Sequence, residues 1–367
     1  MENVNAYESY SSEYIYDWNY YTSTNMTDWD DFIESISYTM VDKIIIIIFM
    51  PIVVVFGIIG NITTIAVIAI NRRMRTSVNV YLANLAIADT LFLALAPDLS
   101  WTSIVNGQLR DEYNIGVEKT WICKFNFYVV DTTVQVAIFT ILAMSIERYR
   151  AICHPIAFRS NKSRSMLRAT QVCCLIWCIT LAWQSRKLVW IEMITHQFPW
   201  PDMYNGVPNL TTTCVYCNDE FHCKIHETLW VFDICLTLTL ILVVVGLYTA
   251  ILVKLRKSKF SAANSTGNNP RSKSEMKVFL TVFLIVTVYI VCIAPFAFLN
   301  VVLIVSEYGD DFAIKTINIL RVALYINSSV NPIIYNAVNN EFRRAFQEMF
   351  NCKKSGKSKP TSGNTVH

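Results

Sequence analysis

Seven long apolar stretches constrain this chain of 367 residues more than any other feature of its sequence. The hydrocarbon core of a bilayer is crossed by about 20 mostly apolar residues in helical form. Within lipid, a helix satisfies its backbone hydrogen bonds internally. The stretches cover residues 44–70, 78–97, 121–145, 168–190, 229–253, 278–305 and 312–337. The sequence therefore predicts an all-α membrane protein, a seven-transmembrane helix bundle.

The distribution of charge predicts how this bundle is oriented. Lys and Arg are enriched in cytoplasmic loops, and 21 of the 31 basic residues lie in 71–77, 146–167, 254–277 and 338–367. The first 42 residues hold nine acidic residues and no Lys or Arg. We therefore expect a multi-pass protein of the plasma membrane, with its N-terminus extracellular and its C-terminus cytoplasmic.

The chain divides into four predicted parts. They are an extracellular acidic, tyrosine-rich tail (1–43), the seven-transmembrane bundle (44–337), a short amphipathic membrane-surface helix (338–352) and a disordered cytoplasmic tail (353–367). In the third part, Phe342, Phe346 and Phe350 recur on one helical face, as in helices that lie on a membrane. Cys352 just beyond is a candidate palmitoylation site or, alternatively, an unmodified thiol.

Two charged groups mark the predicted inner ends of the third and sixth spans. Arg148 stands in the triplet Glu147-Arg148-Tyr149, 25 residues after Cys123, which is about 37 Å along a helix. Glu275 precedes the sixth span and reaches Arg148 only where the two inner ends are close. Such a clasp would hold a closed state, whereas the alternative for the triplet is plain anchoring at the membrane interface.

Polar side chains inside the predicted spans point to a second candidate site, because such groups are costly there and usually functional. Asp89 lies mid-span, with Asn61, Asn327, Ser328 and Asn331 at comparable depth. Oxygen ligands suit hard cations. Asp89, Asn327 and Ser328 are therefore candidate ligands of a possible allosteric Na⁺, and no other cofactor is expected. The alternative is a protonated carboxyl packed between helices.

A series of short motifs gives the chain a family resemblance. In order, it carries Gly60-Asn61, 85–89 (LAIAD), Cys123, Glu147-Arg148-Tyr149, Trp177, 292–295 (CIAP) and 331–335 (NPIIY). From residue 44 to about 352 the chain therefore resembles the rhodopsin-like (class A) G-protein-coupled receptors.

The resemblance implies a mechanism and partners. A ligand moves the sixth helix outward and exposes Arg148 to a heterotrimeric G protein, while Tyr248 and Tyr335 stabilise the open state. Pro332, after Asn331, permits a kink in the seventh helix. Arrestin, receptor kinases and membrane lipids are further expected partners, and no nucleic acid is expected.

Four positions depart from the family pattern. Ile293 replaces the usual tryptophan of the sixth span, and Tyr289 replaces a phenylalanine. Leu240 replaces the proline of the fifth span, and Ala137 a serine of the sodium cage. These departures bear on the activation switch of the sixth span and on the sodium site.

Four cysteines fall outside the membrane, and they allow three patterns of disulfide pairing. These are Cys123, Cys214, Cys217 and Cys223. The resemblance implies a bridge from Cys123 to the second outer loop, where Cys214 is favoured over Cys217, which leaves Cys217 with Cys223. That loop, 191–227, is long enough for a hairpin lid. Asn25 and Asn209 stand in glycosylation sequons.

The outer halves of three spans contain candidate ligand-binding residues. They are Asp131, Gln135, Phe296, Asn300, Arg321 and Tyr325. Amine receptors have their acid at the position of Val130, and a retinal-binding lysine would stand at Tyr325, so that both ligand types are disfavoured. Arg321 would instead hold a carboxylate or amide carbonyl of a peptide. The alternative is an internal Asp131–Arg321 ion pair.

The sequence thus predicts a G-protein-coupled receptor for an extracellular neuropeptide. The stretches IERYRAICHPI and NPIIYN resemble receptors for thyrotropin-releasing hormone or neuromedin U. The alternatives are a chemokine-like or scavenger receptor of the same fold, or a membrane transporter. Enzyme chemistry is not expected, because no paired nucleophile and base is present and the five histidines lie mainly in loops.

Overall fold

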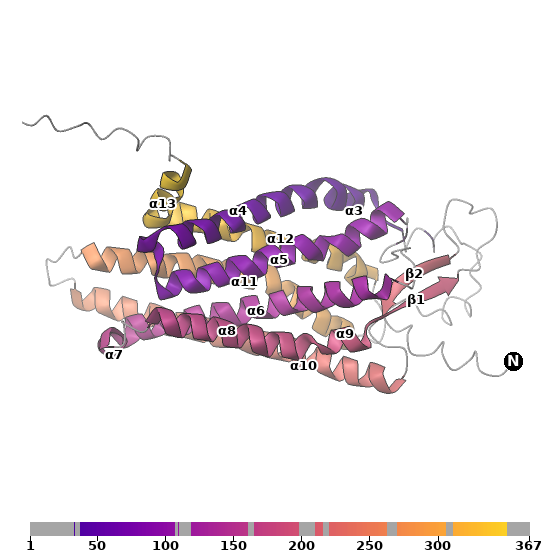
Figure 1. Ribbon diagram of the computed structural model, residues 1–367. Coiled ribbons are helices and arrows are strands. Elements are labelled where there is room, and N and C mark those ends of the chain that lie inside the picture. Colours follow the sequence, from indigo (N-terminus) through magenta and orange to yellow (C-terminus); the bar gives the residue numbers. More distant parts are fainter. Residues whose placement is uncertain are drawn as a thin grey trace, which may run out of the picture.

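A computed structural model describes residues 33, 37–106, 109, 119–160, 165–197, 210–215, 220–262, 270–305 and 311–350. The chain forms a bundle of long helices with a two-stranded hairpin at one end (Figure 1). The long helices are α4 (Met50–Ile70), α5 (Ser77–Asn106), α6 (Thr120–Cys153), α8 (Ser165–Gln184), α10 (Glu220–Ala262), α11 (Pro270–Val305) and α12 (Asp311–Val338). Short elements are α3 (Met40–Ile44), a π-helical turn (Ile45–Phe49), a 3₁₀ turn (Arg72–Met74), α7 (Pro155–Ser160), α9 (Arg186–Trp190) and α13 (Asn340–Phe350).

Each of the seven predicted apolar stretches is helical over nearly its whole length, although the first includes a π-helical turn and the fourth is interrupted at Ser185. Among the described residues, six helices are long and apolar enough to cross a membrane, and the first of these runs from Met40 through the π-helical turn to Ile70. The seventh stretch lies in α12, which is less apolar and packs against α4, α5 and α11 within the same bundle. The helices extend beyond the predicted apolar runs, because polar residues continue a helix after it leaves the hydrocarbon.

The first span contains a π-helical turn that has a local cause. The backbone N–H of Met50 donates to the carbonyl of Ile45, and Pro51 has no N–H to offer. Neither Met50 nor Pro51 therefore donates a backbone hydrogen bond to the carbonyl of Ile46. The indole Nε1 of Trp101, on α5, fills this position at 3.1 Å. The turn thus connects the outer ends of the first two spans.

The fourth predicted span, 168–190, is divided in the structure. Helix α8 ends at Gln184, and α9 begins at Arg186 after a turn at Ser185. The Ser185 hydroxyl donates to the carbonyl of Ala182 at 2.8 Å, which satisfies one end of the broken helix. The turn places Arg186 and Lys187 at the outer end of the bundle, where α9 packs against α6.

Two glycines allow α4 and α12 to approach closely. A Cβ atom on Gly57 would lie 2.6 Å from a side-chain carbon of Leu93 and would also overlap the hydroxyl of Ser329. A Cβ atom on Gly60 would lie 3.0 Å from the ring of Pro332. A larger residue at Gly57 would require the Leu93 and Ser329 side chains to shift, so the first span packs closely on its neighbours at these two glycines.

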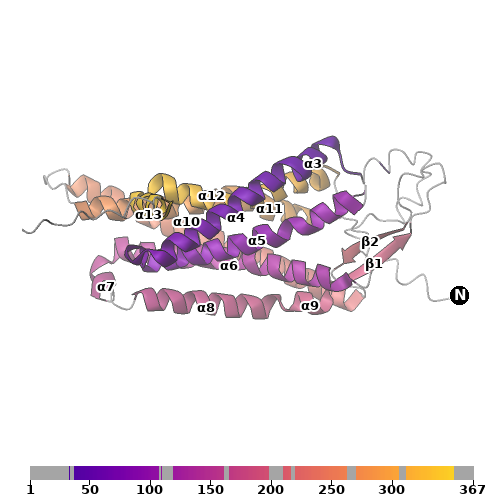
Figure 2. The same ribbon diagram turned by 45° about the horizontal axis from the view of Figure 1, so that its top comes forward.

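The predicted amphipathic helix is present as α13, which turns away from the direction of α12 (Figures 1 and 2). Its first phenylalanine is placed differently from the prediction. Phe342 is fully buried and packs edge-on against Tyr335, with ring centroids 5.7 Å apart. Phe346 also packs on the inner core of the bundle. The N-terminal part of the face of α13 that was predicted to contact lipid therefore contacts protein, because α13 follows directly on α12.

The second outer loop contains the expected hairpin. Strands β1 (Glu192–Gln197) and β2 (Leu210–Val215) pair in antiparallel fashion, with Met193 opposite Cys214. Both ribbon views place the hairpin at one end of the bundle and α13 at the other (Figures 1 and 2). Ile191 and Met193 are buried against Cys123 at the outer end of α6.

Candidate functional site

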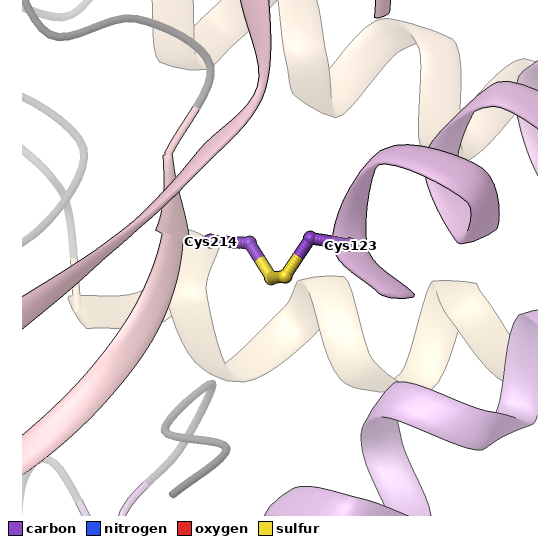
Figure 3. Close-up of a disulfide and its surroundings, with 2 residues drawn as sticks. All are labelled: Cys123 and Cys214. Carbon is purple, nitrogen blue, oxygen red and sulfur yellow. A yellow bond between two sulfur atoms is a disulfide. The ribbon is translucent and has the colours of Figure 1, made fainter. Parts of the chain in front are cut away.

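A disulfide fixes the hairpin over the outer end of the bundle. Cys123, in the first turn of α6, is bonded to Cys214 on β2 (Figure 3). The predicted pairing of these two cysteines is confirmed. Cys223, near the start of α10, is also disulfide-bonded, whereas Cys217 lies outside the described residues. The bridge makes the hairpin a fixed part of the outer face.

Asp131 and Gln135 lie one helical turn apart on α6, and both contact the fourth span. The ammonium of Lys187 lies 3.0 Å from Oδ2 of Asp131. The amide of Gln184 donates to Oε1 of Gln135 at 3.3 Å. The partner of Asp131 is thus Lys187, and the alternative Asp131–Arg321 ion pair is absent from the described residues.

The two members of this ion pair differ in exposure. The Lys187 side chain is 5% exposed and that of Asp131 is 35% exposed. The cation is therefore enclosed by protein, while about a third of the carboxylate remains accessible. Gln184 is likewise buried, behind the half-buried Gln135.

A second ion pair connects the fourth and fifth spans. Arg186 pairs with Asp233 of α10 and stacks over the ring of Trp183, with 4.5 Å from the guanidinium carbon to the ring centroid. The indole of Trp183 donates to the other oxygen of Asp233 at 2.8 Å. The Asp233 carboxylate is bonded at both oxygens, which indicates a structural role.

Sequence reasoning missed Lys187, Arg186 and Asp233. A usable signal was present, because each is a charged residue within a predicted apolar stretch, and such charges mark function or pairing. The sequence could not show which acid meets which base.

The candidate residues of the sixth and seventh spans lie in separate surroundings. Tyr325 is buried and packs against Phe92 of α5, with ring centroids 5.5 Å apart. Arg321 lies one turn earlier on α12. Asn300 is buried and donates back to the carbonyl of Phe296 at 2.6 Å, on the same helix.

A polar cluster surrounds Asp89 in the middle of the bundle. Asp89 is 2% exposed and accepts a hydrogen bond from the Asn331 amide at 2.8 Å. Asn61 donates to the carbonyls of Gly57 and Ser328, at 2.9 and 2.8 Å. The cluster therefore connects the first, second and seventh spans.

Oxygen atoms remain available in this cluster. Within the described residues, the amide oxygens of Asn61 and Asn331 are buried without a hydrogen-bond partner. Asn327 and Ser328 are also buried. Buried oxygens beside a carboxylate are ligands that a small hard cation accepts, so the residues present fit the expected Na⁺.

Arg148 is held at the inner end of α6 by its neighbour. Its guanidinium lies 3.2 Å from Glu147, whose same oxygen accepts a hydrogen bond from Ser77 at the start of α5. The Arg148 side chain is only 11% exposed. The side chain of Glu275 lies outside the described residues, so the predicted clasp stays a prediction.

Two tyrosines connect this inner end to the sixth and seventh spans. Tyr248 on α10 packs against Phe279 and Phe283 of α11, with ring centroids 5.9 and 5.7 Å apart. Tyr335 is fully buried beside Pro332 and Phe342. Both hydroxyls are buried without an ordinary hydrogen-bond partner among the described residues, so each can form a new bond if the helices move.

Several predicted sites lie outside the described residues. These are the glycosylation candidates Asn25 and Asn209 and the palmitoylation candidate Cys352.

Comparisons with known proteins agree with this architecture. Residues 60–335 match the 7 transmembrane receptor (rhodopsin family). The chain is 26% identical over 311 residues to the allatostatin-A receptor of Bombyx mori, covering 83% of this chain and 79% of that receptor. It is 27% identical over 317 residues to human neuromedin-U receptor 2, covering 83% and 70%.

A third relative is the mouse somatostatin receptor type 2, which is 27% identical over 314 residues, covering 85% of this chain and 78% of the receptor. The matched region runs from the middle of α4 to near the end of α12, and it includes Asp89 and the Arg148 triplet. The chain therefore belongs to the rhodopsin family of seven-transmembrane receptors.

Proposed function

We propose that this plasma-membrane receptor responds to an extracellular neuropeptide and signals through heterotrimeric G proteins. The observation that carries the proposal is that its relatives are named as receptors for allatostatin-A, neuromedin-U and somatostatin. The hairpin, held over the outer end by the Cys123–Cys214 bridge, supports it. A fixed outer hairpin gives a peptide backbone an ordered surface on which to dock.

The N-terminus is extracellular in this proposal, and the C-terminus cytoplasmic. Disulfides persist in oxidising compartments, and the bridge lies at the hairpin end. Helix α4 ends at Ile70, at the opposite end of the bundle (Figure 1), and the basic residues Arg72 and Arg73 follow it directly. Extracellular glycosylation at Asn25 and Asn209 and palmitoylation at Cys352 belong to the same proposal.

The peptide is proposed to enter the outer half of the bundle. Candidate contacts are Asp131, Gln135, Phe296, Asn300, Arg321 and Tyr325. Arg321 lies above the buried pair of Tyr325 and Phe92, and a guanidinium there would hold a carboxylate or carbonyl oxygen of the ligand.

At the inner end, activation is proposed to move α11 outward. The ring contacts of Tyr248 with Phe279 and Phe283 would open with that movement. Arg148 would leave Glu147 to meet the G protein, and the Tyr248 and Tyr335 hydroxyls would gain new partners. Pro332, beside Asn331 and inside α12, would permit the helix to kink during this change. Arrestin and receptor kinases are proposed to act on the activated state.

The Asp89 cluster is proposed to stabilise the closed state. Asp89, Asn327 and Ser328 would hold Na⁺, with the amide oxygens of Asn61 and Asn331 nearby. A cation held there would connect the first, second and seventh spans and so oppose their rearrangement.

A screen of neuropeptides on cells that express the receptor tests this function. Calcium and cyclic-AMP responses that depend on the receptor, and that are absent from untransfected cells, are expected for at least one peptide. Arg321→Ala should lower the potency of that peptide at least tenfold at equal surface expression. Unchanged potency would remove Arg321 from the binding site, and ion flux without G-protein signalling would contradict the receptor function.

A further inference from the structure

We propose that Asp131 and Gln135 form a subsite that binds an uncharged carboxamide of the ligand, and that Lys187 prevents it from binding an amine. This inference rests on the proposed function, because it names the chemistry that one part of the peptide site recognises. It goes beyond that function, because it assigns a ligand group to two residues and a selective role to a third.

The hydrogen-bonding groups of the two residues are complementary to an amide. Lys187 contacts Oδ2 of Asp131, and Oδ1 makes no hydrogen bond within the part of the chain that the structure describes. Gln184 donates to Oε1 of Gln135, which leaves the Nε2 donor of Gln135 without a bond there. One acceptor and one donor therefore remain available, one turn apart on α6.

The spacing suits a group with one donor and one acceptor. Residues four apart on a helix have Cβ atoms about 5–6 Å apart. A carboxamide can donate its N–H to Asp131 and accept from Gln135 at the same time. Helix α6 is flanked by α5, α8, α9, α10 and α11, and about a third of the Asp131 side chain remains accessible among them.

Charge decides which ligand groups the subsite accepts. Lys187 balances the charge of Asp131 from a buried position. A ligand ammonium would bring a second cation to one carboxylate, and displacing Lys187 would break its 3.0 Å contact with Asp131 while the ammonium stays enclosed by protein, which is costly. A ligand carboxylate would be repelled by the like charge of Asp131. A neutral amide neither competes with Lys187 for Asp131 nor is repelled by that carboxylate.

Lys187 is thus a positioning residue that sets selectivity without contacting the ligand. Gln184 has the same relation to Gln135, since it is buried behind that side chain and orients its amide.

Three fragments of similar shape test the subsite on the purified full-length receptor in nanodiscs. They are phenylacetamide, phenethylammonium and phenylacetate, and apparent affinity is read from the shift in the melting temperature with fragment concentration. Only phenylacetamide is expected to stabilise the intact receptor. In Lys187→Met, the preference for phenethylammonium over phenylacetamide should rise about tenfold or more, because Asp131 then has an uncompensated charge.

The double variant Asp131→Leu/Lys187→Met serves as the matched control, because it removes both charges together, and it should lose the response to phenylacetamide. Preference for the amine in the intact receptor, no response to any fragment, or an amide response that survives in the double variant would each overturn the proposal. The result does not depend on G-protein signalling, so failure of this inference and failure of the neuropeptide screen can be told apart.

Discussion

The unequal burial of Lys187 and Asp131 predicts that the two single substitutions have unequal costs. Asp131→Leu leaves an ammonium that is 5% exposed without the carboxylate 3.0 Å away. Removal of one partner from a buried pair costs about 3–5 kcal/mol. Lys187→Met instead leaves a carboxylate that is 35% exposed. Because that carboxylate keeps access to water, we expect a cost of about 1 kcal/mol or less, as for exposed pairs.

The double variant Asp131→Leu/Lys187→Met should lie close to the intact receptor, since replacing both members of a buried pair by apolar groups is often nearly neutral. The measurement is the thermal unfolding midpoint of the four purified proteins in one detergent, combined as a double-mutant cycle. Equal losses for the two single variants, or a double variant less stable than Asp131→Leu, would refute the reasoning from burial.

Three further predictions concern the rest of the bundle. Cys214→Ser should destabilise the receptor by about 2–5 kcal/mol and lower its surface expression, measured by thermal unfolding and by antibody staining. Cys235→Ser, which removes an exposed free thiol, should change neither stability nor surface expression. Gly57→Val should lower the melting temperature far more than Gly246→Val, because an added Cβ atom meets Leu93 and Ser329 at the first position and nothing within 4 Å at the second; equal effects would argue against close helix contact. Glu275→Ala should raise basal G-protein signalling, and an unchanged basal level would contradict its clasp with Arg148.

Sequence alone determined the number and type of the spans. In hydrocarbon, each segment that crosses the membrane must be largely apolar and must satisfy its own backbone hydrogen bonds. A run such as 44–70 can therefore be recognised without knowing which helices pack against it. The Cys123–Cys214 bridge was also predicted, although through family resemblance rather than from the spacing of the cysteines. The hairpin was expected in a loop that is long enough to hold one, and this expectation also came through the family resemblance.

Only the tertiary structure decided which polar groups meet. Asp131 pairs with Lys187, a residue that sequence reasoning did not single out, and not with Arg321, which was the alternative partner. One residue along a helix turns a side chain by about 100°, so a pairing depends on the rotation and depth of both helices. The break at Ser185 affects both for Lys187, and the close packing of Gly57 against the Ser329 side chain affects both for α12. Such relations join distant parts of the chain, and local sequence patterns do not contain them.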